Sequence, residues 1–448
     1  MLKRTFSSCL VVGAMLAGTA AQAEKPGSIF PYKTHIETLE NGLKVILVPM
    51  SSNGLVAYWS VVRTGARDEY EAGHTGFAHF FEHMMFRGTE KFPQDKYGEI
   101  TTKIGADDNA FTSDDLTAYH LSITKEDLET VMEIESDRFQ NLKYAEQQFK
   151  TEAGAVYGEY RKNRSSPFFT IYEAMHKAAF DTHTYGHTAM GYVEDIQAMP
   201  TMYDYSISFF NRYYRPENVV LFIVGDIEPK NTMTLVHKYY SGWKPGYVAP
   251  KIPVEPEQTA EKRIDVAYEG KALPIVWCAY KAPAFDPKDP TMVASTLLAD
   301  LAFGETSELH KKLVLDEQVC EFVQAEHNLN RDPTLFDVLA RVKDPAKVDY
   351  VLGEIDRTIA QYQATPVDAG RLADVKSRAK YGFLMGLETP SAVASAMARF
   401  IALTGGIDCV DAMYQAFDTV TPADIQKAAS TYLTKNRRTV GVLRGGQS

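Results

Sequence analysis

An internal repeat constrains the fold of this 448-residue chain more than any other feature of its sequence. Residues 201–225 align with residues 421–445 at a constant offset of 220 positions. Each segment predicts a capped helix, then an apolar strand and a turn. Trp59 and Trp277, which both lie within alternating apolar strands, are 218 positions apart. The sequence therefore predicts two copies of one structural unit.

A proline-rich segment lies between the two copies. Residues 245–262 contain four prolines, and proline is excluded from helix interiors and central strands. We expect this segment to form an extended linker between two domains. The predicted organisation is a signal peptide at 1–23, a first repeat at 24–244, the linker at 245–262 and a second repeat at 263–448.

The pattern within each copy indicates an α+β class. Hairpin-like strands at 43–49 and 57–64 alternate with long amphipathic stretches such as 125–142. A regular βαβ winding would instead alternate single strands and helices. We therefore expect two homologous α/β repeats, each a mostly antiparallel sheet flanked by helices.

The first residues have the pattern of a secretory signal. Lys3 and Arg4 precede a short apolar run at residues 9–17, and Ala21 and Ala23 form a small-x-small cleavage site. The apolar run is too short to span a bilayer. The sequence predicts export to the periplasm and cleavage after Ala23.

Composition limits the classes of partner that the chain can bind and the covalent or metal cross-links that can stabilise it. The chain carries 47 basic and 58 acidic residues, a net charge of −11, which gives no electrostatic footprint for nucleic acid. After cleavage, Cys278, Cys320 and Cys409 remain. Because their number is odd and no CxxC spacing occurs, neither a disulfide framework nor a thiolate metal site is indicated.

The residues with catalytic potential are concentrated in HTGFAHFFEHMMFRGT at residues 74–89. His79, Glu82 and His83 share one helix face, at 0°, about 300° and about 40°, while the aromatic and methionine side chains occupy the opposite face. Two histidines at i and i+4 can bind one Zn²⁺, and the glutamate can act as general base. The alternative is a pair of ordinary polar histidines on a solvated helix face.

A catalytic zinc site usually has a third protein ligand. Glu152 and Glu159 lie seven positions apart on one helix-permissive segment, about 10 Å apart along one face. Only one of them can therefore bind the same metal ion. Taken alone, two such carboxylates are usually solvated ion-pair partners.

HFFEH, followed by Glu159 at 76 positions after His83, resembles the inverted-zincin motif of the M16 zinc peptidases (pitrilysin, insulinase and mitochondrial processing peptidase). The chain resembles the short, two-repeat, exported bacterial type of this family. Four blocks in the first half and a looser one in the second carry the resemblance: LENGLKVILVP (39–49), GARDE (65–69), GADDNAFTSDDLTAYH (105–120), YRPENVVLFIVGD (214–226) and FGETSELHKKL (303–313).

The resemblance implies a role for each matching residue. His79, His83 and Glu159 would bind one zinc ion per chain, and Glu82 would be the general base that activates water. Glu152 would orient a ligand histidine from outside the coordination sphere.

Three further residues, Asn109, Ala110 and Phe111, resemble the family's substrate-binding edge strand, to which an extended peptide adds as a further strand. The alternative is an ordinary edge strand. His183, in a loop that also resembles a family segment, is expected to face solvent.

The second repeat has lost the zinc motif. Thr296, Ala299 and Asp300 occupy the positions of His79, Glu82 and His83. The family commonly pairs a zinc-bearing half with a half that supplies an Arg and, seven residues later, a Tyr, which hold the substrate and stabilise the oxyanion. In this chain those positions are Val314 and Glu321.

This departure suggests that a related M16-like subunit supplies the Arg and Tyr in a hetero-oligomer, with a homodimer as the second choice; alternatively the lone chain is a weak peptidase. The sequence thus predicts a zinc-dependent endopeptidase that hydrolyses extended peptides or unfolded polypeptides in a closed chamber. Two alternatives are a structural or partner subunit of the same fold with little activity, and a periplasmic binding protein without chemistry.

Overall fold

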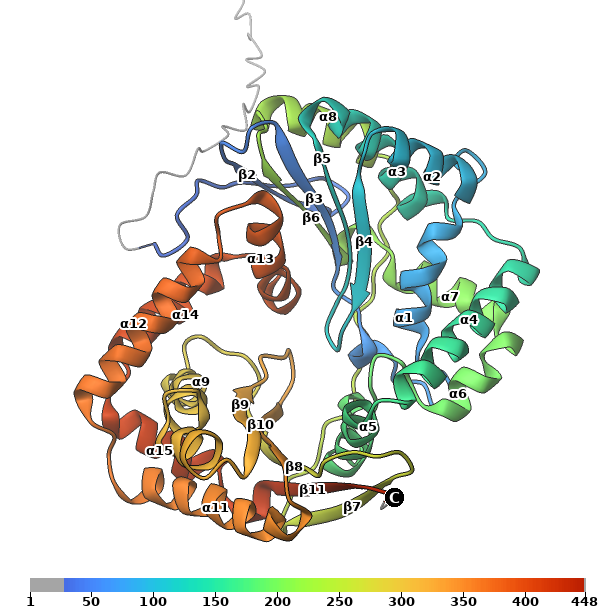
Figure 1. Cartoon of the computed structure of the whole chain (residues 1–448). Helices are drawn as coiled ribbons and strands as arrows, with labels where there is room; N and C mark the ends of the chain where they lie inside the picture. The colour runs from blue at the N-terminus through green and yellow to red at the C-terminus, as the bar shows by residue number, and fades with distance from the viewer. Residues whose placement is uncertain (1–27, 447–448) are drawn as a thin grey trace, which may run out of the picture.

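The computed structural model describes residues 28–446, so the predicted signal peptide lies outside the described residues. Two sheets dominate the fold (Figure 1). The first sheet has the order β1 (His35–Thr38), β2 (Lys44–Pro49), β6 (Val219–Gly225), β3 (Leu55–Val62), β5 (Thr117–Thr124) and β4 (Asp107–Thr112). The second has the order β7 (Lys262–Tyr268), β11 (Arg438–Gly445), β8 (Ile275–Ala282), β10 (Thr334–Val342) and β9 (Cys320–His327).

The two sheets have the same topology. In the first, β6 pairs parallel with β2 and antiparallel with β3. In the second, β11 pairs parallel with β7 and antiparallel with β8. Trp59 on β3 and Trp277 on β8 occupy equivalent strands. The predicted α+β class of two homologous repeats with mostly antiparallel sheets is confirmed.

The hairpin-like strands predicted at residues 43–49 and 57–64 are present but do not pair with each other. These segments form β2 and β3, but β6 lies between them in the sheet. The alternating apolar pattern identified both strands correctly and could not report which strand pairs with which. β6 is apolar and buried along its whole length, as expected of a central strand.

Helices cover both faces of each sheet. In the first repeat they are α1 (Phe77–Met84), α2 (Gln94–Lys103), α3 (Leu128–Asn141), α4 (Glu146–Arg164), α5 (Pro167–Ala179), α6 (Val193–Ala198), α7 (Tyr203–Tyr213) and α8 (Pro229–Tyr240). In the second they are α9 (Pro290–Phe303), α10 (Glu308–His310), α11 (Val348–Ala364), α12 (Ala369–Met385), α13 (Pro390–Thr404), α14 (Asp408–Thr419) and α15 (Pro422–Tyr432).

The repeats exchange one helix each. Helix α13 of the second repeat packs on the first sheet, where Met397 and Ile401 are buried in one cluster with Trp59. Helix α5 of the first repeat packs on the second sheet, where Met175 is buried in one cluster with Trp277. The approach of α5 is so close that a Cβ at position 441, which is glycine, would collide with Sδ of Met175. Each sheet is therefore completed by a helix from the other repeat.

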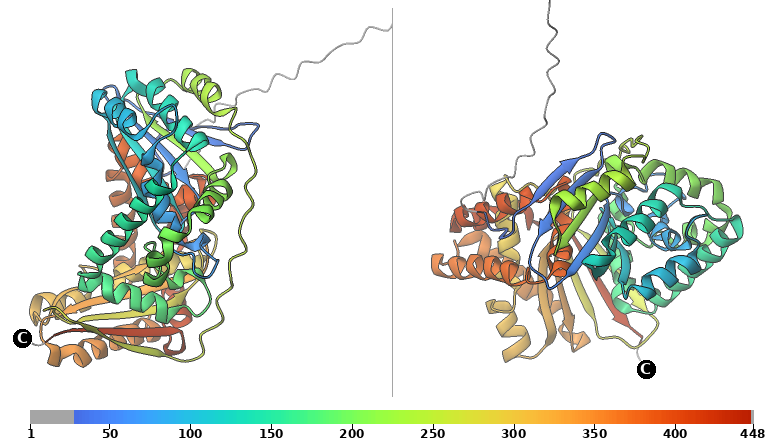
Figure 2. Two further views of the ribbon diagram at one scale, coloured as in Figure 1. Left: turned by 90° about the vertical axis from the view of Figure 1, so that its right-hand side faces the viewer. Right: turned by 90° about the horizontal axis from the view of Figure 1, so that it is seen from above.

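The linker is extended, and Glu255 is one of the residues that hold it to the rest of the protein. Residues 243–260 contain no helix or strand and run along the outside of the molecule (Figure 2). The Glu255 carboxylate accepts hydrogen bonds from the backbone N–H groups of Asp181, Thr182 and His183 at 2.9–3.1 Å, and from Lys281 Nζ at 2.9 Å. These donors lower the pKa of Glu255 to about 2, although burial opposes the shift.

The expectation that His183 faces solvent is wrong. Its side chain is 3% exposed, and Nε2 lies 3.0 Å from Oδ2 of Asp332. Its Nδ1 accepts a hydrogen bond from the backbone N–H of Tyr185. Because Asp332 belongs to the β9–β10 loop, this histidine joins the two repeats.

No single described helix is long and apolar enough to cross a membrane. Helices α13 and α14 reach the length and apolarity of a membrane span only when taken together, and they are bent by 94° relative to each other. Several α13 residues in this pair are buried against the first sheet.

The three cysteines within residues 28–446 are buried, and none of them is joined to another in a disulfide. Burial raises the pKa of Cys278 to about 12 and that of Cys320 to about 11. Both thiols are therefore protonated at neutral pH and poorly nucleophilic.

Glu255 makes a testable contribution to stability. Its folded pKa of about 2 lies below the unfolded value of about 4.3, so its contribution is complete above pH 4.3 and is lost as the pH falls toward 2. We expect Glu255→Gln to lower the melting temperature at pH 7 and to have a smaller effect at pH 3. Glu257→Gln, an exposed carboxylate on the same linker, is the control. An equal effect of Glu255→Gln at both pH values would contradict this assignment.

Candidate metal centre

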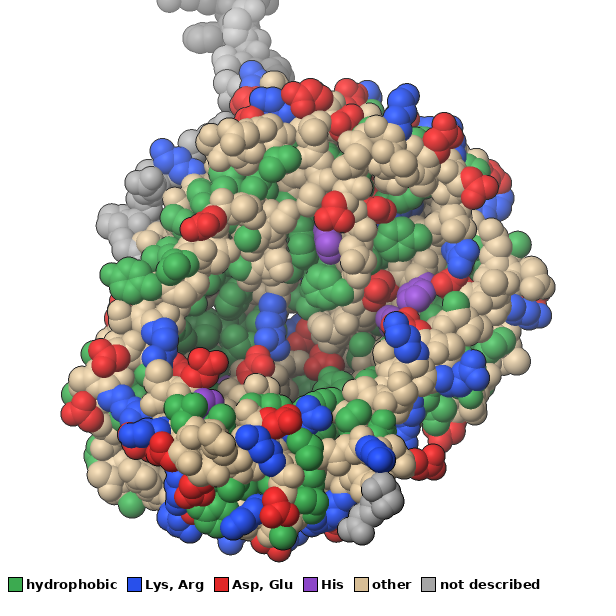
Figure 3. Space-filling model, in the orientation of Figure 1, with side chains coloured by type: hydrophobic (Ala, Val, Ile, Leu, Met, Phe, Trp, Pro, Cys, Tyr) green, Lys and Arg blue, Asp and Glu red, His purple; other side chains and the backbone are tan. Residues whose placement is uncertain are grey.

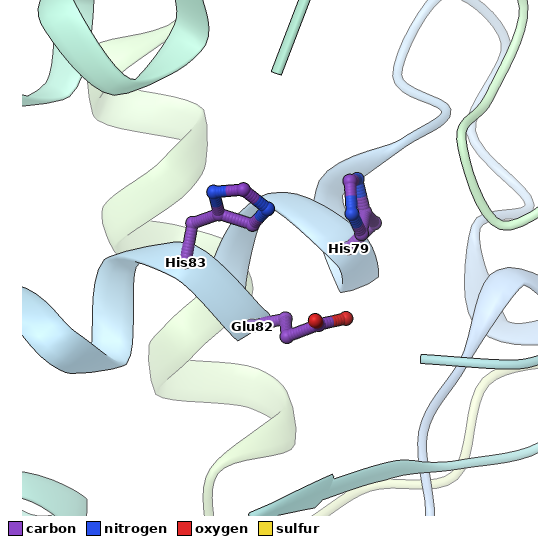
Figure 4. A group of neighbouring side chains, drawn as sticks. All are labelled: His79, Glu82 and His83. Carbon is purple, nitrogen blue, oxygen red and sulfur yellow. The ribbon is translucent and has the colours of Figure 1, made fainter. Parts of the chain in front are cut away.

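Helix α1 presents two histidines and a glutamate to one side. Figure 4 shows the side chains of His79, Glu82 and His83 extending from this helix. Their ligand atoms all lie within 4.8 Å of one another. The opposite face carries Phe77, Phe80, Phe81, Met84 and Met85, all fully buried. Core packing therefore fixes the rotation of α1 about its axis.

The N-terminus of α1 is held by a residue that the sequence analysis did not single out. The Glu69 carboxylate accepts hydrogen bonds from the backbone N–H groups of Gly76 and Ala78 at 2.7 and 2.6 Å. Gly76 has φ of +89°, and a Cβ there would lie 2.7 Å from the carbonyl oxygen of Met190. Burial raises the pKa of Glu69 to about 8, while the two N–H donors act against this shift. Glu69 is the last residue of the GARDE block, so the family resemblance could have indicated its importance.

Helix α4 brings two carboxylates to the histidines. Oε2 of Glu159 lies 3.6 Å from Nε2 of His79 and 3.3 Å from Nε2 of His83. Oε1 of Glu152 lies 2.9 Å from Nδ1 of His83. If Nδ1 donates its proton to Glu152, the Nε2 lone pair of His83 remains free to bind a metal. Glu152 also pairs with Arg87, which the sequence analysis did not identify.

The two distances from Oε2 of Glu159 to the histidines are close to those between ligands of a tetrahedral zinc ion. Two ligands with bonds of about 2.0–2.2 Å to tetrahedral zinc lie about 3.3–3.5 Å apart. The distances from Glu159 Oε2 to the two Nε2 atoms agree with this to about 0.1 Å. A direct hydrogen bond would bring these atoms closer, to about 2.7–3.0 Å. The donor set of two imidazoles and one carboxylate is also one that zinc accepts.

The electrostatics of α1 favour metal ligation by neutral imidazole. Burial lowers the pKa of His79 to about 3, so this side chain is neutral at pH 7, and its buried Nδ1 has no hydrogen-bond partner among the residues that the structure describes. Burial raises the pKa of Glu82, and the hydroxyl of Thr112, which donates to Oε2 of Glu82 at 2.7 Å, acts against this shift. Thr112 thus fixes the Glu82 carboxylate from the neighbouring strand, a contact that the sequence did not reveal.

Strand β4, which contains Asn109, Ala110 and Phe111, lies at the edge of the first sheet and, within residues 28–446, pairs with β5 alone. The backbone N–H of Ala110 donates to Oδ1 of Asn109 at 2.9 Å. The Phe111 side chain is 37% exposed. The strand ends at Thr112, so its C-terminal end lies directly beside Glu82.

A cavity of about 520 Å³ opens next to these residues. His79, Glu82, Glu159 and Phe111 form part of its wall. Other residues of the first repeat form most of the remaining wall, and the second repeat contributes residues 328–330 of the β9–β10 loop and Arg399 of α13. Figure 3 shows the hollowed face of the molecule on which the two repeats meet.

The second repeat contains no counterpart of the zinc motif. Thr296, Ala299 and Asp300 lie on α9, and Asp300 pairs with Arg378 at 2.8 Å. Val314 lies in the π-helical turn Lys311–Asp316. Glu321 lies on the edge strand β9 and pairs with Arg341 at 3.1 Å.

Two family models match the chain in sequence order. Insulinase (Peptidase family M16) matches residues 44–192, and the Peptidase M16 inactive domain matches residues 203–379. The second match begins at α7, whereas the second sheet begins at residue 262, so the boundary between the two models does not coincide with the boundary between the sheets.

Known proteins are similar over most of the chain. Zinc protease PqqE of Helicobacter pylori is 27% identical, covering 91% of this chain and 92% of the relative. The crystal structure of a protease from Helicobacter pylori has a TM-score of 0.86 and 26% identity, covering 92% of this chain and 99% of that one.

The periplasmic protease PqqL from Escherichia coli shares the fold, with a TM-score of 0.77 and 18% identity, covering 95% of this chain and 48% of that one. The two family models, together with a relative aligned over 91% of the sequence, show that this chain belongs to peptidase family M16.

Proposed function

We propose that the protein is a zinc-dependent endopeptidase that hydrolyses extended peptides or unfolded polypeptides. The observation that carries this proposal is the approach of Oε2 of Glu159 to Nε2 of His79 and to Nε2 of His83, at 3.6 and 3.3 Å, close to the separations of tetrahedral zinc ligands. In this proposal the first repeat (24–244) is catalytic and the second (263–448) is not. A bound zinc ion supplies a Lewis acid, which polarises the scissile carbonyl and lowers the pKa of a coordinated water.

Glu82 is the general base in this mechanism. Its carboxylate extends from the same helix as the two histidines, and Thr112 holds one of its oxygens. Glu82 takes a proton from the attacking water and delivers it to the leaving amine nitrogen. Because Thr112 is the last residue of β4, the base lies at the end of the strand that would bind the substrate.

The free edge of β4 is the proposed substrate platform. An extended peptide can pair with this edge through main-chain hydrogen bonds, which bind any sequence. The N–H of Ala110, now bonded to the side chain of Asn109, could instead donate to a peptide carbonyl. The strand leads the peptide toward Glu82 and the cavity.

A partner subunit would complete the site. Val314 and Glu321 offer no cationic or hydroxyl donor where the resemblance implies Arg and Tyr, and a carboxylate disfavours an oxyanion. This chain also spans only 48% of the PqqL chain with which it shares a fold. We therefore propose a hetero-oligomer in which a related subunit carries the Arg and Tyr and encloses the chamber together with this chain. We also propose that the mature protein acts in the periplasm after cleavage behind Ala23.

Replacing Glu82 tests the general base. We expect Glu82→Gln to lower kcat for a quenched peptide by about 10²–10⁴-fold, because the amide cannot accept the proton. The bound zinc should remain at one ion per chain, as measured by atomic absorption. Glu99→Gln, an exposed glutamate on α2, is the control. Full activity of Glu82→Gln would exclude this mechanism.

Replacing Glu152 tests the support of His83. We expect Glu152→Ala to weaken zinc binding by about 10–100-fold, because His83 loses the carboxylate that fixes its tautomer and orientation. Competition with a chelating dye measures the zinc dissociation constant. Glu146→Ala removes an exposed carboxylate of the same helix and should leave zinc binding unchanged. Equal zinc affinities for wild type and Glu152→Ala would show that Glu152 does not orient the ligand.

Reconstitution tests the partner. We expect the mature chain alone to bind zinc and cleave peptides weakly, and a related subunit with the Arg and Tyr to raise kcat while a larger species forms on gel filtration. A fully active monomer would contradict the partner proposal and leave the peptidase proposal intact. A chain that binds no zinc and cleaves nothing under either condition would favour the alternative, a structural subunit of the same fold.

A further inference from the structure

The wall of the cavity beside the candidate metal centre includes one cationic side chain among the described residues. Among the described residues that line it, Arg399 is the single Lys or Arg, whereas Glu82, Asp114, Asp115 and Glu159 are acidic. Arg399 lies on α13, the helix that the second repeat packs against the first sheet. The guanidinium therefore reaches the same cavity as the proposed zinc ligands from the opposite repeat.

The acidic residues of the cavity wall have partners of their own. Asp115 accepts hydrogen bonds from the backbone N–H of Arg331 at 3.0 Å and from the hydroxyl of Tyr185 at 2.8 Å. Asp114 accepts one from Nδ2 of Asn330 at 3.1 Å. Neither carboxylate forms an ion pair with Arg399 within 4.0 Å among the described residues.

Arg399 is oriented but weakly neutralised. Its Nε donates to the carbonyl oxygen of Leu329 at 3.0 Å, which fixes the plane of the guanidinium. Its Nη1 lies 3.6 Å from Oε1 of Glu326, beyond hydrogen-bond distance, and the two side chains are 44% and 67% exposed. Such an exposed pair contributes little free energy. A carboxylate that approached from the cavity could therefore replace Glu326 and form a bidentate pair with Arg399.

We propose that Arg399 forms a binding subsite for a carboxylate of the peptide substrate. This inference rests on the proposed peptidase function and deepens it by naming a preferred substrate class, peptides with a carboxylate a few residues from the scissile bond. A peptide paired with β4 passes Phe111 and Thr112 and then enters the cavity, which Arg399 helps to line. The carboxylate could belong to a Glu or Asp side chain or to the peptide C-terminus, and both present the same two oxygens to the guanidinium.

Matched peptides test the subsite. In each pair of quenched peptides a Glu is replaced by Gln, at successive positions on both sides of the scissile bond, with the C-terminus either free or amidated. We expect the wild-type protein, assayed with its partner, to prefer Glu over Gln at one position by about tenfold in kcat/KM, mainly through KM. A preference that depends instead on the free C-terminus would assign the carboxylate to the chain end.

Variants of Arg399 test its role. Arg399→Gln should abolish the preference while leaving the Gln peptide unaffected, and Arg399→Lys should restore part of it because lysine keeps the charge without the bidentate geometry. Arg444→Gln, which removes a similarly exposed arginine (49%), is the matched control. A preference that survives Arg399→Gln, or an equal loss for both peptides, would overturn the proposal.

A binding assay separates this inference from the proposed function. Fluorescence anisotropy measures the binding of labelled Glu and Gln peptides to Glu82→Gln, with and without Arg399→Gln. If wild type cleaves no peptide but Glu82→Gln binds the Glu peptide in an Arg399-dependent way, the subsite is supported and the peptidase proposal fails. If peptides are cleaved but bind without regard to charge or Arg399, the subsite is excluded and the peptidase proposal stands.

Discussion

The exchange of α5 and α13 between the two sheets is the interaction on which the rest of the structure depends. Each helix inserts apolar side chains against a sheet of the other repeat, so each sheet is buried on both faces by contributions from distant parts of the chain. This exchange brings Arg399 and the β9–β10 loop to the cavity that contains His79 and Glu82. The second repeat, which has no zinc motif of its own, thereby contributes a smaller part of the wall beside the proposed metal centre.

The candidate metal centre depends on three sets of contacts that fix the position of α1. The buried phenylalanines set its rotation, Glu69 holds its N-terminus, and the carboxylates of α4 approach its polar face. Because interiors are close-packed, a shift of α1 would be resisted by all three sets of contacts at once. A site held this way is preorganised, and binding a metal ion need not order the helix first.

Local patterns in the sequence predicted the repeat, the α+β class and the clustering of His79, Glu82 and His83, because each depends on spacing along one element. The approach of Glu159 to both histidines followed from the family resemblance and not from its spacing to Glu152, which left either carboxylate possible. The insertion of β6 between β2 and β3, the burial of His183 and the roles of Glu69, Thr112 and Arg87 could not be predicted, because they depend on which surfaces meet in space. Arg399 was not predicted for the same reason, since nothing in the sequence of α13 indicates that this residue lines a cavity beside the first repeat.

The exchange of helices also sets an order of folding events. The inner face of the first sheet, with Val48, Trp59 and Phe222, is covered by α13, which begins about 165 residues after β6 ends. Until that helix emerges and docks, a wide apolar face and the unpaired edge of β4 are both exposed, a combination that favours aggregation. Contacts of such long sequence separation also form slowly. The first repeat therefore cannot reach its final packing until residues 390–404 are available to dock, and its apolar face needs protection until then.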